Sequence, residues 1–255
     1  QTCALPISKE CNEARCLGKC TKDTGWPAPN NTSSIRRKGK VRRDSRIATF
    51  NLGGSIDKVF LLLEKDLDVV LLQEHKLLAH QIPGVMKRLL KAGWHGIWHP
   101  AIKTGDHAAN RSGGVAIIVR TQVLIVQGRG EEHHRLAHAI IPWSKKRSLH
   151  ILNVHLFDTS YPLRSNHNKD LLHTAQQYLF EAGRVLWVMG GDFNHEPEQL
   201  EHWVRPATLV QPGKPTHQQG GCIDWFLVNP AINQGFKVEV KRSEEHTSEL
   251  QSHSD

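Results

Sequence analysis

The feature that most constrains this sequence is a series of short apolar runs that end in polar residues. Six runs are predicted strands, and they span residues 47–51, 68–74, 113–120, 149–155, 184–189 and 222–228. The run at 68–74 contains the unbroken apolar stretch Val69-Val70-Leu71-Leu72, which is typical of a strand that is covered on both faces. A bilayer-spanning helix needs about 20 consecutive apolar residues, so the sequence predicts no membrane span.

Three helical patterns lie between these strands. Residues 55–65 and 168–181 carry apolar side chains at helical spacing, and a helix over residues 81–93 is predicted to end at Gly93. Helices and strands interleave without a repeat of fixed length, which indicates a layered α/β domain. The regular pattern begins at Arg46, and we predict one domain over residues 46–241.

Both ends of the chain resemble translated sequencing adapters. We expect residues 1–7 and 242–255 to be artefacts, with the natural termini missing, although an ordinary polar tail is the alternative. Formal net charge is +8 for the whole chain, with 33 Lys and Arg against 25 Asp and Glu. Residues 8–241 carry +11, because the two end segments hold one of those bases and four of those acids.

Residues 8–45 are predicted to form a basic, polar linker. It contains six basic residues within eight positions: Arg36, Arg37, Lys38, Lys40, Arg42 and Arg43. Such a run is either a solvated linker or an arm that binds nucleic acid. Cys11, Cys16 and Cys20 lack the paired spacing of common zinc sites, so we interpret them as free thiols.

Polar residues recur at equivalent ends of the predicted strands. These polar residues are Asn51, Glu74, Asn153, His155, Asp192 and Asn194, and Asp224 joins them from inside an apolar strand. A carboxylate or imidazole beside aliphatic strands is costly to bury unless it is paired or bound to metal. Singly, each has a structural explanation, such as a tight turn at Gly190-Gly191. Together they predict one shared site at the mouth of a sheet.

The residue types in this set indicate the chemistry. Two carboxylates, several amides and an imidazole, with no reactive Cys or Ser motif, suit a hard cation such as Mg²⁺, with Mn²⁺ as a substitute. A carboxylate that accepts a proton from water, combined with a cation that offsets phosphate charge, is typical of a phosphodiesterase. Zinc fits less well, because the sequence has no His-Glu-x-x-His motif.

Five motifs also carry a family resemblance over residues 46–241. They resemble, in order, the signature of the endonuclease/exonuclease/phosphatase superfamily, which includes deoxyribonuclease I, apurinic/apyrimidinic endonucleases and non-LTR retrotransposon endonucleases. The motifs are Thr49-Phe50-Asn51, Leu72-Gln73-Glu74, Asn153-Val154-His155, Gly191-Asp192-Phe193-Asn194 and Ile223-Asp224-Trp225-Phe226. The resemblance implies a four-layer α/β/β/α sandwich with its site at one end of two packed sheets.

The resemblance also implies a role for each motif residue. Glu74 would be the metal ligand, with Asn51 beside it. Asp192 would activate the attacking water, Asn194 would orient the phosphate, and His155 would contact the scissile phosphate.

Asp224 would orient a second histidine from a terminal Ser-Asp-His motif, and Lys76 and Asn153 are candidate substrate contacts. The terminal motif is expected within residues 242–255, where His253-Ser254-Asp255 has the letters in the wrong order. We therefore expect a C-terminally truncated domain that lacks the second histidine. Loss of such a charge-stabilising group costs a factor of about 10²–10³ in rate.

The favoured hypothesis is a Mg²⁺-dependent phosphodiesterase, and more specifically a monomeric endonuclease that acts on DNA. The basic excess and the basic run motivate nucleic acid as the partner. One alternative is a non-catalytic, nucleic-acid-binding remnant of a retroelement. Another is a phosphoinositide or sphingolipid phosphatase, which would need an apolar membrane-facing loop. An intracellular location is expected, and a nuclear one for a retroelement endonuclease.

Overall fold

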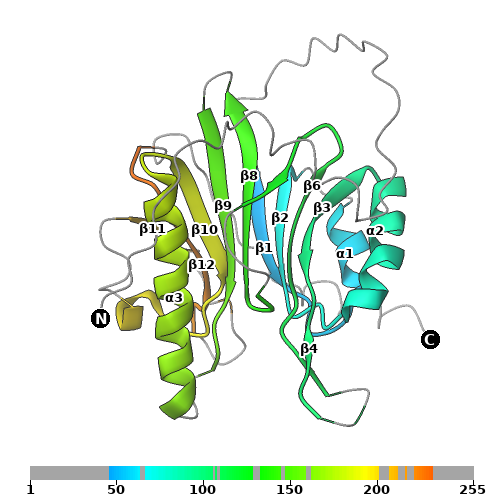
Figure 1. Ribbon diagram of the computed structural model, residues 1–255, viewed down its shortest axis with the longest axis horizontal. Helices are drawn as coiled ribbons and strands as arrows, with labels where there is room; N and C mark the ends of the chain where they lie inside the picture. The colour runs from blue at the N-terminus through cyan, green and yellow to red at the C-terminus, as the bar shows by residue number, and fades with distance from the viewer. Residues whose placement is uncertain are drawn as a thin grey trace, which may run out of the picture. The chain divides into compact units, whose positions relative to one another are not determined.

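The structure is a computed structural model that describes residues 46–63, 67–105, 107, 110–128, 133–144, 147–158, 162–200, 207–211, 216 and 221–231. The two adapter-like segments and the predicted linker lie outside these residues. In the described part, two β-sheets pack face to face and helices cover their outer faces (Figure 1).

The first sheet has four strands. In spatial order they are β1 (Ile47–Asn51), β2 (Val69–Gln73), β6 (Val115–Arg120) and β3 (Trp94–His99). β1 and β2 are parallel, and β6 is antiparallel to both of its neighbours. The register pairs Asn51 with Gln73, so the ends of β1 and β2 lie side by side.

The second sheet has six strands. In spatial order they are β11 (Thr208–Val210), β12 (Asp224–Val228), β10 (Leu186–Asp192), β9 (Arg147–His155), β8 (Leu136–Ser144) and β7 (Val126–Gln127). β9 and β10 are parallel, and the other neighbours are antiparallel. Asp192 pairs with His155 on one side and with Asp224 on the other, which brings three predicted site residues together.

Helices form the outer layers. The first sheet is covered by α1 (Lys58–Leu63) and α2 (Ile82–Lys91), and the second by α3 (Pro162–Ala182). The remaining elements are short: the 3₁₀ turns η2 (Ala79–Gln81) and η3 (Pro197–Leu200), and the hairpin β4 (Ile102–Lys103) and β5 (Arg111–Ser112).

The alternation of side chains along β2 explains its unbroken apolar run. Val69 and Leu71 belong to the core between the two sheets, whereas Val70 and Leu72 belong to the core under α1 and α2. Successive side chains of a strand point to opposite faces, so a strand inside a four-layer sandwich must be apolar throughout. The predicted α/β/β/α sandwich is confirmed.

All six predicted strands and all three predicted helices are present, with different ends. Helix α3 begins six residues before its predicted start, at Pro162, and α1 begins three residues after its predicted start, at Lys58. Strands β3 and β8 were not predicted from the sequence. In the described part of the chain, no helix combines the length and apolar character needed to cross a bilayer.

Two glycines directly precede Asp192 at the end of β10. Gly190 and Gly191 lie within β10 and form no turn. A Cβ on Gly191 would collide with the carbonyl oxygen of Val154, and one on Gly190 would collide with the ring of Phe226. Glycine is therefore required at both positions for the close approach that places Asp192 beside the neighbouring strands.

Candidate active site

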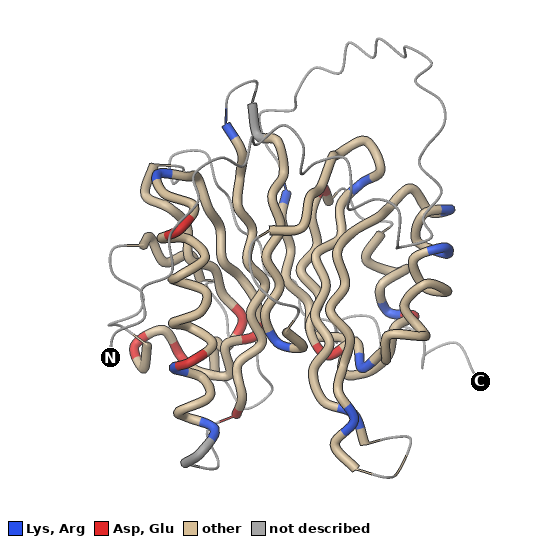
Figure 2. Tube along the Cα trace, viewed as in Figure 1, with Lys and Arg blue, Asp and Glu red and all other residues tan. Residues whose placement is uncertain are grey.

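The predicted site residues gather at one end of the sandwich. Asn51 and Glu74 stand at or just after the ends of β1 and β2 in the first sheet. His155 and Asp192 end β9 and β10 in the second sheet, and Asp224 begins the antiparallel neighbour β12. Charged positions are concentrated at the lower end of both sheets in the view of Figure 2.

Asp192 is the most enclosed carboxylate of this group, at 4% exposure. Its Oδ2 accepts a 2.7 Å hydrogen bond from Nδ2 of Asn51, and its Oδ1 accepts a 3.0 Å bond from the backbone N–H of Asn194. Burial raises the pKa of Asp192, the two hydrogen bonds oppose this rise, and the negative charge of Glu74 adds to it. The carboxylate is thus held in place by donors and made more basic by its surroundings.

Asp224 lies directly across the strand pair from Asp192. Burial, followed by the negative charge of Asp192, raises the pKa of Asp224 to about 7 against the opposing effect of a hydrogen bond from Thr216. Two neighbouring buried carboxylates resist holding two negative charges together. The pair therefore gains or loses a proton near neutral pH.

Glu74 is the more accessible carboxylate, with 27% of its side chain exposed. Its Oε1 lies 3.5 Å from Nε2 of His155, and its Oε2 lies 3.5 Å from Nζ of Lys76. The first of these contacts joins the two sheets. Lys76, a candidate phosphate contact, therefore points its ammonium group at the carboxylate that is expected to bind the cation.

Three residues of the site have left-handed backbones. Glu74, Lys76 and Asn194 have φ values of 50°, 54° and 50°, and no other non-glycine residue in the described ranges has a positive φ. Such conformations are strained for residues with a Cβ, and they persist where the surrounding structure enforces them, often at functional sites. Their restriction to the predicted site is independent support for its location.

His155 is buried beside a buried arginine, Arg135. The guanidinium of Arg135 donates to Nδ1 of His155 at 3.1 Å and to the carbonyl oxygens of His155 and Leu156. Burial, followed by the positive charge of Arg135, holds the pKa of His155 well below its usual range. His155 is therefore a neutral ring, and the nitrogen that faces Glu74 carries its proton when Nδ1 accepts from Arg135.

Sequence reasoning missed Arg135. Its guanidinium also lies 3.9 Å from the ring centroid of Phe157 and donates to Oγ of Ser112 at 2.9 Å. Arg135 immediately precedes β8, whose start lies beside the end of β9 because the two strands are antiparallel. A prediction of β8 and of its antiparallel pairing with β9 would have placed Arg135 beside the end of β9, and therefore beside the site.

Asn153 does not occupy the role expected of it. Its side chain is fully buried between the sheets, where Nδ2 donates to the carbonyl oxygens of Leu72 and Ala116 and Oδ1 accepts from Gln73 at 2.6 Å. Both N–H groups are used within the protein, so Asn153 ties the two sheets together and has no donor left for substrate. The expectation of a substrate contact is corrected by this burial.

The side chain of Asn194 is also hydrogen-bonded within the protein. Its Nδ2 donates to the carbonyl oxygen of Leu156 at 2.8 Å, while its backbone N–H bonds Asp192. This geometry orients the turn after β10. A contact of Asn194 with phosphate stays a prediction.

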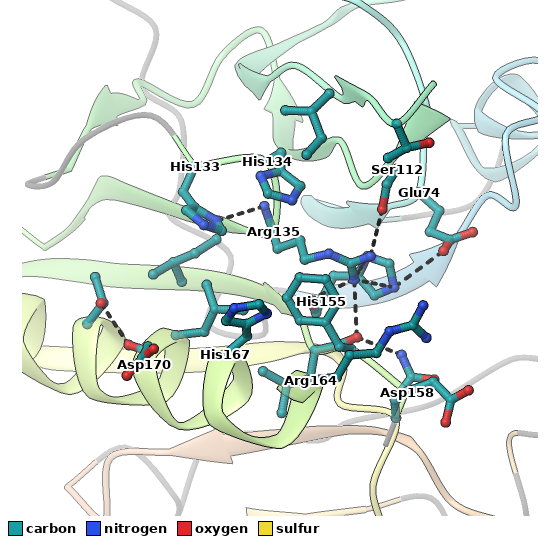
Figure 3. Close-up of a pocket in the computed structure, with 18 of the residues that line it drawn as sticks. Glu74, Ser112, His133, His134, Arg135, His155, Asp158, Arg164, His167 and Asp170 are labelled. Carbon is teal, nitrogen blue, oxygen red and sulfur yellow. Dashed lines mark hydrogen bonds and ion pairs between the residues drawn. The ribbon is translucent and has the colours of Figure 1, made fainter. Parts of the chain in front are cut away.

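A cavity of about 1140 Å³ opens beside these residues. Glu74, His155 and Asn194 line one part of it, and α3 lines another part through residues that include His167 and Asp170 (Figure 3). His133 and His134, to which the sequence analysis assigned no role, also line the cavity and stack on each other with ring centroids 4.6 Å apart. Burial, followed by the charges of His133 and Arg135, lowers the pKa of His134 to about 4, so the His134 ring is uncharged at neutral pH.

The donor set of the site fits a hard divalent cation. Mg²⁺ in proteins keeps several waters and takes one or two carboxylates together with substrate phosphate. Glu74 offers one accessible carboxylate at the cavity, and Asn51 and Asp192 supply further oxygens on the adjoining strands. Among the described residues there is no group of three or more His, Cys, Asp or Glu side chains that could hold a metal by themselves.

Other predicted features lie elsewhere. The basic run (Arg36, Arg37, Lys38, Lys40, Arg42 and Arg43) and the thiols Cys11, Cys16 and Cys20 are outside the described residues. Residues 242–255, where the terminal histidine motif was sought, are outside them as well.

Comparisons with known proteins agree with this geometry. A model of the Endonuclease/Exonuclease/phosphatase family matches residues 48–243. No curated protein sequence matches the chain.

Several solved structures share the fold. The 3′ phosphatase NExo from Neisseria, bound to a product DNA hairpin, is 20% identical with a TM-score of 0.52, over 74% of this chain and 88% of that one. The human Nocturnin catalytic domain is 17% identical with a TM-score of 0.56, over 74% and 83%. The AP endonuclease LMAP from Leishmania major is 12% identical with a TM-score of 0.53, over 74% and 80%.

Proposed function

The chain belongs to the endonuclease/exonuclease/phosphatase family, and from this premise we propose that it is a divalent-cation-dependent phosphodiesterase that cleaves DNA. The observation that carries the proposal is the contact between the sheets: Glu74 from one and His155 from the other lie 3.5 Å apart at the cavity. Asp192 lies at the end of β10, in register with His155. A water-activating carboxylate and an accessible carboxylate thus belong to the same end of the sandwich.

Asp192 is proposed to accept the proton of the attacking water. As the water oxygen forms its bond to phosphorus, the P–O bond to the leaving alcohol breaks, and that oxygen takes up a proton from solvent. Burial raises the pKa of Asp192, which makes the carboxylate a better base, and the donors Asn51 and Asn194 fix its direction. The base must be deprotonated, so the reaction favours pH values above the titration of the Asp192–Asp224 pair.

The phosphate is proposed to bind in the cavity at this end of the sandwich, next to Glu74 and His155. The proton on the His155 nitrogen that faces Glu74 is available to a phosphate oxygen, and Lys76 supplies positive charge next to it. When bound at Glu74, Mg²⁺, or Mn²⁺ in its place, would offset the negative charge that develops on the phosphate. Burial, followed by the positive charge of Arg135, lowers the pKa of His155 and keeps it neutral, and Arg135 holds it in place by donating to its ring and its carbonyl.

DNA is the proposed substrate because the chain is basic and one structure of this fold, NExo, holds a product DNA hairpin. A catalytically inactive nucleic-acid binder and a lipid phosphatase are the rivals. The full chain should nick supercoiled plasmid in Mg²⁺ and lose this activity in Asp192→Asn, which is nearly isosteric. Arg88→Gln, which removes a surface ion pair with Asp57 on the first sheet's outer layer, should nick as the wild type does.

Three outcomes would contradict the proposal. Nicking that survives Asp192→Asn would place the activity elsewhere, including in a contaminant. Salt-dependent DNA binding without any nicking would favour the inactive binder. Turnover of a phosphoinositide or sphingomyelin without nicking would favour the lipid phosphatase.

A further inference from the structure

The segment Glu74-His75-Lys76 has an unusual backbone. Both residues that flank His75 are left-handed, with φ near 50°, while His75 itself has no positive φ. An isolated chain would relax from two such residues in three positions, because each is strained for a side chain with a Cβ. Some contact must hold the segment, and therefore the Glu74 carboxylate, in this shape.

The side chain of His75 provides that contact. It is fully buried, its Nδ1 accepts a 3.0 Å hydrogen bond from the backbone N–H of Leu77, and its Nε2 lies 3.1 Å from the carbonyl oxygen of His99. An imidazole nitrogen that accepts leaves the proton on the other nitrogen, so Nε2 donates to His99. The ring thus anchors the segment to the end of β3 and closes the turn that follows it.

The His75 ring is closely packed against Gly114 and Trp98. A Cβ on Gly114 would lie 2.6 Å from Cε1 of His75, and Gly114 itself is left-handed at φ 87°. The backbone N–H groups of His75 and Lys76 donate to the carbonyl oxygens of Gly114 and Gly113 at 3.2 Å each. The ring of Trp98 packs against His75 with centroids 5.1 Å apart.

We propose that His75 is a positioning residue that holds the Glu74 carboxylate in the direction needed to bind its divalent cation. The inference rests on the proposed function in one respect, because it takes Glu74 to be the cation ligand. His75 itself is fully buried and is not among the residues that line the cavity, so its proposed effect on the cation acts through Glu74. Groups that orient a metal ligand typically change metal affinity or activity 10–100-fold when they are replaced.

The test compares four variants of the full chain with the wild type. Glu74→Gln removes the proposed ligand, and His75→Leu removes both hydrogen bonds of the anchor. His75→Asn keeps an acceptor for the Leu77 N–H but cannot reach His99. His95→Leu is the control, because His95 is a partly buried histidine of β3 whose Nε2, like that of His75, lies within hydrogen-bonding distance of a backbone carbonyl, at 2.8 Å from that of Val123.

The primary measurement is Mn²⁺ binding, followed by the electron paramagnetic resonance signal of free Mn²⁺ without DNA. Wild type should bind one Mn²⁺ that Glu74→Gln loses. His75→Leu should weaken binding about 10–100-fold, His75→Asn should fall between it and the wild type, and His95→Leu should bind normally. In plasmid nicking, His75→Leu should lower kcat at saturating DNA and leave KM nearly unchanged.

The inference is overturned when His75→Leu binds Mn²⁺ as His95→Leu does, or when Mn²⁺ binding does not depend on Glu74. When His75→Leu does not fold, His75→Asn carries the same comparison. Failure of the proposed function is distinguishable: Mn²⁺ binding that depends on Glu74 and His75, without cleavage of DNA, rejects the nuclease and keeps His75 as the positioning residue.

Discussion

Nδ2 of Asn51 donates a 2.7 Å hydrogen bond to Oδ2 of Asp192, and the two residues are 141 positions apart in the chain. One lies at the end of β1 in the first sheet and the other at the end of β10 in the second. The bond stabilises the ionised carboxylate that burial would otherwise disfavour. It therefore couples the packing of the two sheets to the basicity of the proposed catalytic base.

Replacing Asn51 by Ala should raise the pKa of Asp192, because the donor that opposes the effect of burial is lost. We expect the acidic limb of the kcat profile to move to higher pH, and kcat at pH 7 to fall about 10–100-fold, as for loss of a hydrogen bond to a charged group. Plasmid nicking across pH 5–9 measures both. The control is Thr49→Ala, which lies on the same strand as Asn51 and removes a side-chain bond to Gln73 on β2. An unmoved limb in Asn51→Ala would contradict the coupling.

Asp224→Asn should stabilise the fold at alkaline pH. The folded-state pKa of Asp224 is raised to about 7, so its contribution to stability is fully present below the unfolded pKa of about 4 and is lost as pH rises through 7. At pH 8.5 without cation, the variant should melt at least about 2–4 °C higher than the wild type, the shift that 1 kcal/mol gives in a domain of this size. At pH 4 the two should melt together, and a higher melting temperature at pH 4 alone would refute this assignment.

His155 should not titrate in the working pH range. Its pKa is well below the ordinary value because the ring is buried beside Arg135. His155→Gln should lower kcat about 10²–10³-fold, as loss of a phosphate-directed donor does, without moving either limb of the pH profile. A limb near pH 6.5 that disappears in this variant would show that His155 acts by gaining a proton.

Gly191→Ala should prevent normal folding. The new Cβ would collide with the carbonyl oxygen of Val154 in the adjacent strand, which neither strand can avoid without breaking its pairing. We expect a loss of more than about 4 kcal/mol in unfolding free energy, or insoluble protein. Gly53→Ala is the control, because Gly53 also has a positive φ but faces open space, and the cost there should be about 1–2 kcal/mol. Equal urea midpoints for the two variants would contradict the steric argument.

Much of the fold could be predicted from local pattern. The apolar run of β2 and the two glycines before Asp192 are signatures that lie within a few residues, because strand periodicity and steric exclusion of a Cβ are local properties of the sequence. β8 has no such signature, because its apolar residues are interrupted by His138 and Pro142. The apolar pattern of β3 is interrupted in the same way, by two histidines and a glycine.

The site was predictable as a set of residues but not as a set of contacts. The motifs identified Glu74 and Asp192, whereas Arg135 depended on an unpredicted strand. Asn153 is a candidate substrate contact from the sequence, and only the packing of both sheets shows that its side-chain N–H groups donate to the carbonyl oxygens of Leu72 and Ala116. Pairings across 80 or more positions are set by tertiary packing, which local periodicity does not encode.

The most direct test of the central claim, that two sheets build one catalytic site, is a double-mutant cycle on kcat for plasmid nicking in Mg²⁺. Glu74→Gln, Asp192→Asn and the double variant are compared with the wild type, all at saturating DNA. Residues that act as a unit are strongly non-additive, so the double variant should be within about threefold of the slower single variant. Rate losses that multiply in the double variant would show that Glu74 and Asp192 act independently, and that the two sheets do not share one site.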